Sequence, residues 1–199
     1  VNNAKNGVSN LDISVSIKTD GKWGPFRELS KLNSEFNEGS PFEAGTYLYW
    51  WTETKRNDPK PKFFRSKISD GEYSQKEQIF DFPDNALVDF INMEEGYALM
   101  TMRSKNTDYD IFISFRDKNG KWSSPINMGK AVNSESTEKA ASISPDGKYI
   151  FFVSNRSENL NPKRIWNHPY FEGGEEDIWK ADVYWLDSSI IEDLRIREK

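Results

Sequence analysis

Short segments in which β-branched or aromatic residues alternate with polar residues recur along most of the chain. A period of two places successive side chains on opposite faces, so these segments predict β-strands with one buried face. Almost no helical periodicity appears before the C-terminal end. The predicted strands are residues 11–16, 47–51, 62–66, 97–102 and 110–114, and two strands within 141–154.

Three tight turns recur at a nearly constant spacing. In each, a glycine follows Asp or Asn, a pair that supplies the positive φ angles of a hairpin turn. The glycines lie 50 and 49 residues apart. An aromatic residue opens the following strand, and we expect Trp23 and Trp122 to fill core space between neighbouring units. The three copies are Asp20-Gly21-Lys22-Trp23, Asp70-Gly71-Glu72-Tyr73 and Asn119-Gly120-Lys121-Trp122.

Each repeat unit thus carries four short strands. Four-stranded units of about 40–50 residues are typical of β-propeller blades. A solenoid or a sandwich accounts for a four-strand period less naturally. The sequence therefore predicts an all-β domain over 1–199, with units at about 11–35, 36–82, 83–131 and 132–187 and a short terminal helix at 188–196.

The terminal helix is predicted from two features. Ser189-Ile190-Ile191-Glu192 has the form of a capping box, in which the serine and the glutamate satisfy the first backbone N–H groups. Ile190, Ile191 and Leu194 then fall on one helical stripe.

Acidic residues recur at a similar spacing, just before the innermost predicted strand of successive units. They are Glu38, Asp89 and Glu138. In a propeller these positions lie near one mouth of the central channel, where a ring of carboxylates can bind a cation or sugar hydroxyls. In the alternative interpretation, each carboxylate caps a turn or accepts backbone N–H bonds between units, as repetition in every unit favours.

Residues 157–175 interrupt the repeat with Asn-Pro, His-Pro and Gly-Gly pairs and predict a long loop inserted between two strands. Its aromatic and basic residues are candidate ligand contacts, or the loop is a structural plug. His168 is the chain's one histidine, too little for a metal site. The candidates in this loop are Arg164, Trp166, His168 and Tyr170.

Composition narrows the function classes. Aromatic residues make up 14% of the chain, which predicts a folded domain, and a net charge of -5 argues against nucleic-acid binding. The chain has no cysteine, so it has neither a disulfide nor a Cys-ligated zinc site. No catalytic serine elbow, phosphate loop or calcium loop is found, so no cofactor is predicted. No apolar run is long enough for a membrane span.

Residues 144–156, Ser-Pro-Asp-Gly-Lys followed by a hydrophobic run and Ser-Asn-Arg, resemble the repeats of TolB-type, WD-repeat-like β-propellers. Residues 110–116, Asn133-Ser134-Glu135 and 182–195 are similar to one bacterial branch, which ends in a strand and a terminal helix. The resemblance implies six blades, of which this chain supplies three to four. We therefore expect a missing N-terminal half, or a partner, to complete the ring.

The resemblance also implies a periplasmic, outer-membrane-associated or secreted protein. The favoured function is a non-enzymatic binding or scaffold module that contacts a protein or another ligand. The alternative is a carbohydrate-active propeller enzyme, of the glycoside hydrolase or sialidase kind, or a glycan-binding protein. Paired carboxylates support that chemistry, but many pairs arise by chance among 32 acidic residues.

Overall fold

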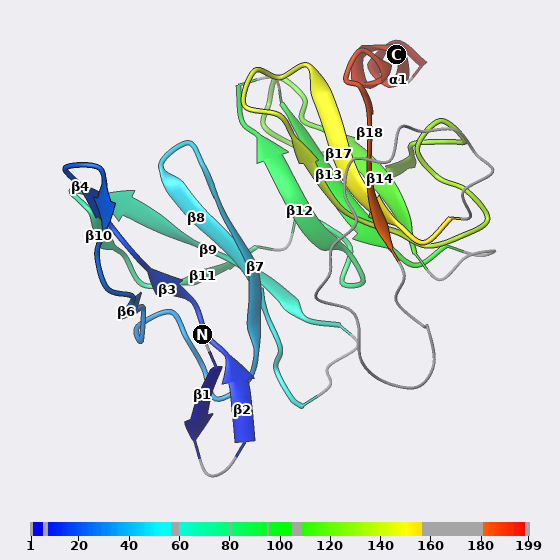
Figure 1. The fold of residues 1–199 in the computed structure, drawn as a ribbon. Helices are drawn as coiled ribbons and strands as arrows, with labels where there is room; N and C mark the ends of the chain where they lie inside the picture. Colours follow the sequence, from blue (N-terminus) through cyan, green and yellow to red (C-terminus); the bar gives the residue numbers. More distant parts are fainter. Residues whose placement is uncertain are drawn as a thin grey trace. The chain divides into compact units, whose positions relative to one another are not determined.

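In the described residues the regular structure consists of antiparallel β-strands and one short helix near the C-terminal end (Figure 1). The computed structural model describes residues 2–5, 8–56, 60–79, 81–94, 96–104, 109–156 and 181–197. The chain forms two compact units, Val1–Leu87 and Val88–Lys199. Within the described ranges, no helix is long and apolar enough to cross a bilayer.

The first unit contains an antiparallel meander that follows chain order. Each strand pairs with the next one, and the third strand pairs with two short outer strands. The sheet has five strands, of which the two short outer ones both pair with the third strand, so that four positions lie side by side. The strands are β7 (Glu38–Ala44), β8 (Tyr47–Thr52), β9 (Lys62–Ser69), and then β10 (Glu72–Tyr73) and β11 (Glu77–Ile79).

The strands before this meander are short and form three separate pairs. The predicted strand 11–16 is interrupted at residues 12–13. At this break the side chain of Asn33, 20 residues further along the chain, binds both backbone polar groups of Ile13. The pairs are β1 (Asn2–Lys5) with β2 (Val8–Leu11), β3 (Ser14–Val15) with β6 (Arg27–Glu28), and β4 (Lys18–Thr19) with β5 (Lys22–Trp23).

The second unit contains two successive meanders of the same kind. The first has four strands and the second has three, and no sheet in the described part of the chain closes on itself. They are β12 (Leu87–Asn92), β13 (Tyr97–Met102), β14 (Asp110–Phe115) and β15 (Ile126–Asn127), followed by β16 (Glu138–Ile143), β17 (Tyr149–Ser154) and β18 (Asp182–Asp187).

Each unit has a hydrophobic core of its own. In the first unit, Trp50 is fully buried among Ile13, Leu32 and Leu48. In the second, the alternate residues of β13, β14 and β17 gather with two residues of the terminal helix. In β13 and β14 the residues between these are mostly buried as well, so the period of two identified core residues but not a single buried face.

The predicted terminal helix is present as α1 (Ile190–Arg197). Ile191 and Leu194 face the core of the second unit, as the helical stripe predicts. The start of the helix differs from a capping box, because Asp187 accepts a hydrogen bond from the Ser189 N–H at 2.9 Å. This bond lowers the pKa of Asp187.

Two of the three predicted tight turns have the expected geometry. Asp20 and Gly21 have φ angles of 51° and 78°, and Asp70 and Gly71 have 52° and 75°. In the third turn only Gly120 has a positive φ. There the Asp117 carboxylate accepts the N–H groups of residues 119 and 121, which stabilises a turn of another type.

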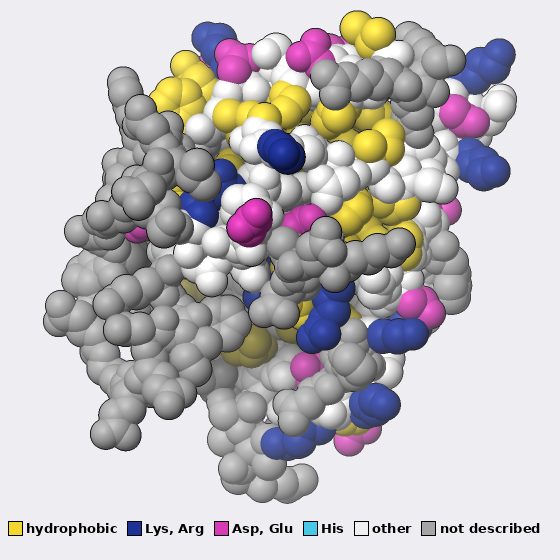
Figure 2. All heavy atoms as spheres, turned by 90° about the vertical axis from the view of Figure 1, so that its right-hand side faces the viewer, with side chains coloured by type: hydrophobic (Ala, Val, Ile, Leu, Met, Phe, Trp, Pro, Cys, Tyr) yellow, Lys and Arg dark blue, Asp and Glu magenta, His cyan; other side chains and the backbone are white. Residues whose placement is uncertain are grey.

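The expectation that Trp23 fills core space is wrong. Its side chain is 70% exposed, whereas Trp122 is half-buried. Among the described strands, β4 and β5 pair only with each other, so this hairpin is not part of a larger sheet. Figure 2 shows one face of the molecule, on which basic and acidic side chains are interspersed, as the charge pattern of the sequence predicts.

Candidate functional site

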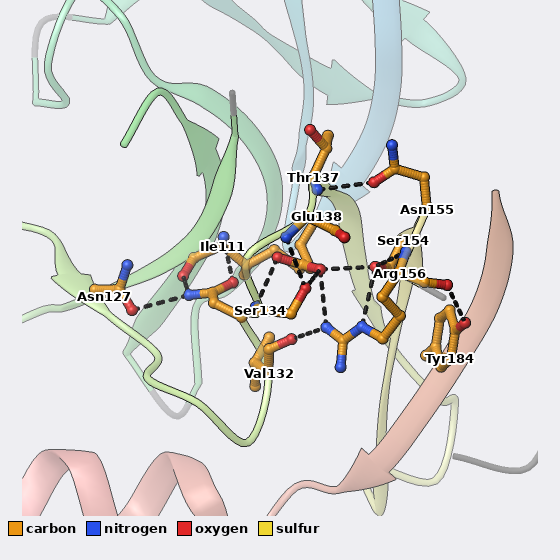
Figure 3. Close-up of polar contacts among 12 residues, drawn as sticks. Ile111, Asn127, Val132, Ser134, Thr137, Glu138, Ser154, Asn155, Arg156 and Tyr184 are labelled. Carbon is orange, nitrogen blue, oxygen red and sulfur yellow. Dashed lines mark hydrogen bonds and ion pairs between the residues drawn. The ribbon is translucent and has the colours of Figure 1, made fainter. Parts of the chain in front are cut away.

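Two loops with the same three polar residues precede β7 and β16. We call them the first clasp (Asn33, Ser34 and Glu38) and the second clasp (Asn133, Ser134 and Glu138). Their glutamates are two of the three predicted acidic site residues and form the first positions of the two strands. Figure 3 shows the second clasp and its neighbours.

The asparagine of each clasp acts like a strand neighbour for an earlier segment. The Asn133 side chain accepts a hydrogen bond from the Ile111 N–H and donates one to the Ile111 carbonyl, both at 2.8 Å. Asn33 makes the same two bonds with Ile13, at 2.9 and 3.1 Å. Each amide therefore bonds both backbone polar groups of that residue, whose carbonyl also accepts the N–H of Leu29 or Met128, and ties the loop to it.

The serine and glutamate of each clasp close the loop on itself. Glu138 accepts hydrogen bonds from the Ser134 N–H at 3.0 Å and from its hydroxyl at 2.7 Å. Glu38 accepts the corresponding bonds from Ser34, at 3.1 and 2.6 Å. The glutamates are 3% and 0% exposed in the first and second clasp. Each carboxylate is thus held at the start of its strand by its own loop.

The second clasp also contains a buried ion pair. Arg156 donates to Glu138 Oε1 at 3.0 Å and to the Val132 carbonyl. The Ser154 hydroxyl donates to the same carboxylate oxygen at 2.7 Å. The side chains of Arg156 and Glu138 are 8% and 0% exposed. A buried carboxylate needs this many donors, because burial removes its hydration.

Aromatic rings enclose the arginine of this pair. The Arg156 guanidinium carbon lies 5.2 Å from the ring centre of Phe152 and 5.0 Å from that of Tyr184. The Tyr184 hydroxyl donates to the Arg156 carbonyl at 3.3 Å. The arginine therefore joins β17 and β18 to the clasp (Figure 3).

The first clasp lacks the arginine. Thr54 lies at the corresponding position, two residues after the strand partner of the glutamate. Within the described residues, Glu38 Oε2 is buried without a hydrogen bond. Burial raises the pKa of Glu38, and the bonds from Ser34 only partly offset it. A different cation lies near it, because Lys76 Nζ donates to the Leu32 carbonyl at 2.9 Å, as Arg156 does to Val132. The charge of Lys76 also lowers the pKa of Glu38, against the larger effect of burial. The two clasps therefore share a geometry but differ in whether the cation bonds the glutamate directly.

Asp89, the third predicted acidic residue, belongs to a different arrangement. It is the third residue of β12, and its carboxylate accepts the Thr101 hydroxyl at 2.7 Å. The backbone N–H groups of Thr101 and Ala141 also bond to it. Burial outweighs these bonds and raises the pKa of Asp89 to about 7. Asp89 therefore bridges β13 and β16 as a group that is half protonated near neutral pH.

A polar hollow of about 620 Å³ opens beside the second clasp. At its wall, Asn127 donates to Asp110 at 2.7 Å and accepts from Asn133 at 2.9 Å. Asp110 is 5% exposed, so its carboxylate orients neighbours rather than facing solvent. This hollow suits a ligand rich in hydroxyl groups. Its lining is Ser104, Asp110, Asn127, Gly129, Lys130, Asn133, Ser134 and Glu135.

The remaining predicted site residues lie outside the described residues: Arg164, Trp166, His168 and Tyr170. In the described part of the chain, no group of three His, Asp or Glu side chains is placed to hold a metal ion. Sequence reasoning missed Arg156 as a partner of Glu138. A signal was available, because Arg156 ends the Ser-Asn-Arg motif that follows the second clasp.

Comparison of the chain with known protein families, curated proteins and solved structures found no match.

Proposed function

We propose that this chain is a non-enzymatic binding or scaffold module, built from TolB-type β-propeller blades and working in the bacterial envelope or outside the cell. Successive antiparallel meanders, of five, four and three strands, support the blade assignment. The clasps support it too, because each ties the start of an inner strand to an earlier segment. Further blades, of the same protein or of a partner, complete the ring in this proposal.

The proposal rests mainly on the two clasp glutamates, whose carboxylates are buried and accept hydrogen bonds from their own loops. A catalytic carboxylate must reach its substrate with at least one oxygen. Glu138 is fully buried and accepts bonds from Ser134, Ser154 and Arg156. Glu38 is buried in the same loop geometry. The repeated acidic residues therefore fit architecture better than chemistry.

The first unit offers a contact surface for a partner. Ile17, Trp23 and Phe26 are 62%, 70% and 75% exposed around the β4–β5 hairpin. Large apolar side chains so exposed are typical of protein interaction sites, and Trp is a frequent energetic anchor there. We propose that this hairpin contacts the protein partner.

The experiment is selection of peptides from a random display library on the immobilised chain. We expect binders that lose affinity at least tenfold for the Trp23→Ser, Phe26→Ser double variant. Ile196→Ser is the matched control, because Ile196 is equally exposed (66%) but lies on α1. Hydrolysis of a glycan panel that Glu138→Gln abolishes, with the circular dichroism spectrum unchanged, would overturn the non-enzymatic assignment.

A carbohydrate-active enzyme is the second candidate, and one observation favours it. The raised pKa of Asp89, about 7, is in the range of a general acid at neutral pH, but Thr101 and Ala141 bond its carboxylate within the fold. A glycosidase also needs a second carboxylate at a fixed distance. Glycan hydrolysis that falls more than a hundredfold in Asp89→Asn would support this candidate, and hydrolysis unaffected by that substitution would exclude Asp89.

A further inference from the structure

We propose that the second unit binds an acidic oligosaccharide of the uronate type, in a hollow between α1 and the turn that follows β14. The hollow has a volume of about 600 Å³, within the range of small-ligand sites. The inference rests on the proposed function in treating the chain as a binding module, but it uses other residues. The lining is Phe115, Arg116, Asp117, Lys121, Trp122, Ser123, Ser124 and Arg195.

Positive charge is concentrated in this hollow. Arg116, Lys121 and Arg195 line it, with one acidic lining residue, Asp117, and Glu192 pairs with Arg195 at 3.1 Å. The excess of positive charge therefore comes from Arg116 and Lys121. The Asp117 carboxylate accepts the backbone N–H groups of Asn119 and Lys121, at 2.9 and 2.8 Å, so it stabilises the turn. In a chain with a net charge of -5, this cluster favours an anionic ligand.

The two guanidinium groups are held in place before any ligand arrives. Arg116 donates from Nε to the Gly120 carbonyl at 3.1 Å. A Cβ at position 120 would lie 2.9 Å from Arg116 Nη2, so glycine makes room for this arrangement. The Arg195 guanidinium carbon lies 4.7 Å from the Phe115 ring centre, and its Nε pairs with Glu192 at 3.1 Å. Planar, pre-positioned guanidinium groups match carboxylates.

The other groups in the hollow favour a sugar over an acidic peptide. Peptides commonly bind by adding a strand to a free edge. Here the backbone is already paired, because Arg116 forms a bridge with Trp122 and the Ser123 N–H donates to the Phe115 carbonyl at 2.8 Å. What the hollow offers is side chains: a half-buried indole for the apolar face of a sugar ring, and the Ser124 hydroxyl.

The test is isothermal titration of the full chain with trigalacturonate at low salt, beside the neutral maltotriose. We expect binding of trigalacturonate alone, weakened at least tenfold by the double substitution Arg116→Ala, Lys121→Ala and by added salt. Both side chains are exposed, so the variant is expected to fold. The matched control is Lys18→Ala, Lys22→Ala, which removes equal charge from the corresponding hairpin of the first unit.

Three results of the titration itself would overturn the inference, and a fourth comes from an acidic peptide. The three are no trigalacturonate binding at millimolar concentration, equal binding of maltotriose, and equal loss of affinity in the control variant. Binding of poly-glutamate that the Arg116, Lys121 variant abolishes would show that the hollow takes an acidic peptide, which also overturns it. Peptide binding through Trp23 can persist in each of these cases. The proposed function is therefore tested independently of the oligosaccharide site.

Discussion

Arg156 and Glu138 show how one residue decides the energetics of a repeated loop. Both clasps bind the glutamate through a serine, but only the second adds a guanidinium, two aromatic rings and a second hydroxyl. Breaking a buried pair costs far more than breaking a surface pair, because the remaining charge stays buried. The two clasps therefore respond differently to the same kind of substitution.

We expect Arg156→Met to lower the free energy of unfolding by about 3 kcal/mol, because Glu138 keeps its charge without its cation. The control is Lys148→Met, which breaks the exposed pair with Asp146 and is expected to cost under about 1 kcal/mol. Urea denaturation measures both. Equal costs would contradict the prediction, as would a failure of Glu138→Gln to recover part of the loss in the Arg156→Met background.

Asp89 makes stability depend on pH. The unfolded carboxyl releases its proton near pH 4, whereas the folded one keeps it until about pH 7. Between these values the native state binds more protons, so the free energy of unfolding falls as pH rises. Above pH 7 the contribution is constant.

We expect Asp89→Asn to flatten this slope and to be more stable than the wild type at pH 8, by on the order of 2 kcal/mol after allowing for partial exposure. Glu38 contributes in the same direction, since its pKa is also raised, so a smaller slope persists. Urea denaturation between pH 4 and 8 measures the effect. A wild-type stability that rises over this range would contradict it.

At the scale of elements, each strand meander depends on what covers its open side. α1 covers part of the core of the second unit with Ile191 and Leu194. An eight-residue helix is too short to be stable alone in water, so its packing holds it. The helix in turn supplies Arg195 to the proposed oligosaccharide hollow.

We expect Leu194→Ala to lower the free energy of unfolding by about 2–4 kcal/mol, because it leaves a cavity under the helix. Ile196→Ala is the control on the same helix and should change stability by less than about 0.5 kcal/mol, since Ile196 is 66% exposed. Thermal denaturation of the two variants measures the difference. Similar melting temperatures would mean that α1 does not stabilise the core.

At the scale of the whole molecule, the alternating pattern identified the central strands of the meanders but not the short strands of the first unit or the outer strands. The pattern predicted β13 at its observed bounds and β8, β9, β14 and β17 to within a few residues. It did not predict the break at Ile13, because a side chain from residue 33 causes it. Nor did it predict the exposure of Trp23, which depends on whether a third strand joins the β4–β5 hairpin.

The candidate site was predicted less well, because burial and partners are not local properties of a sequence. The spacing of Glu38 and Glu138 indicates a repeated role and favours the structural interpretation, but it identifies none of the partners. Only the contacts distinguish a carboxylate that accepts bonds from its own loop from one that faces a channel. Asp89 has a similar spacing but different partners.

The exposed hairpin of the first unit leads to a prediction about the whole molecule. Trp23→Ser with Phe26→Ser should leave the free energy of unfolding within about 1 kcal/mol of the wild type, because both side chains are already in solvent. Trp50→Ser, at a fully buried position, is the destabilising control. Urea denaturation measures both. A large loss in the double variant would mean that these side chains are covered in solution.

The two clasps differ in whether a cation bonds the glutamate directly. The ion pair of the second clasp can therefore be introduced into the first by substitution. Designed repeat proteins need loops that tie one strand unit to the next. The two clasps are such loops, because each bonds the start of a strand to an earlier segment. Thr54→Arg would give Glu38 Oε2 a direct ion pair of the kind that Arg156 makes with Glu138. A rise in melting temperature would show that the stability of this loop can be adjusted through one residue, which makes the loop useful in designed repeat proteins.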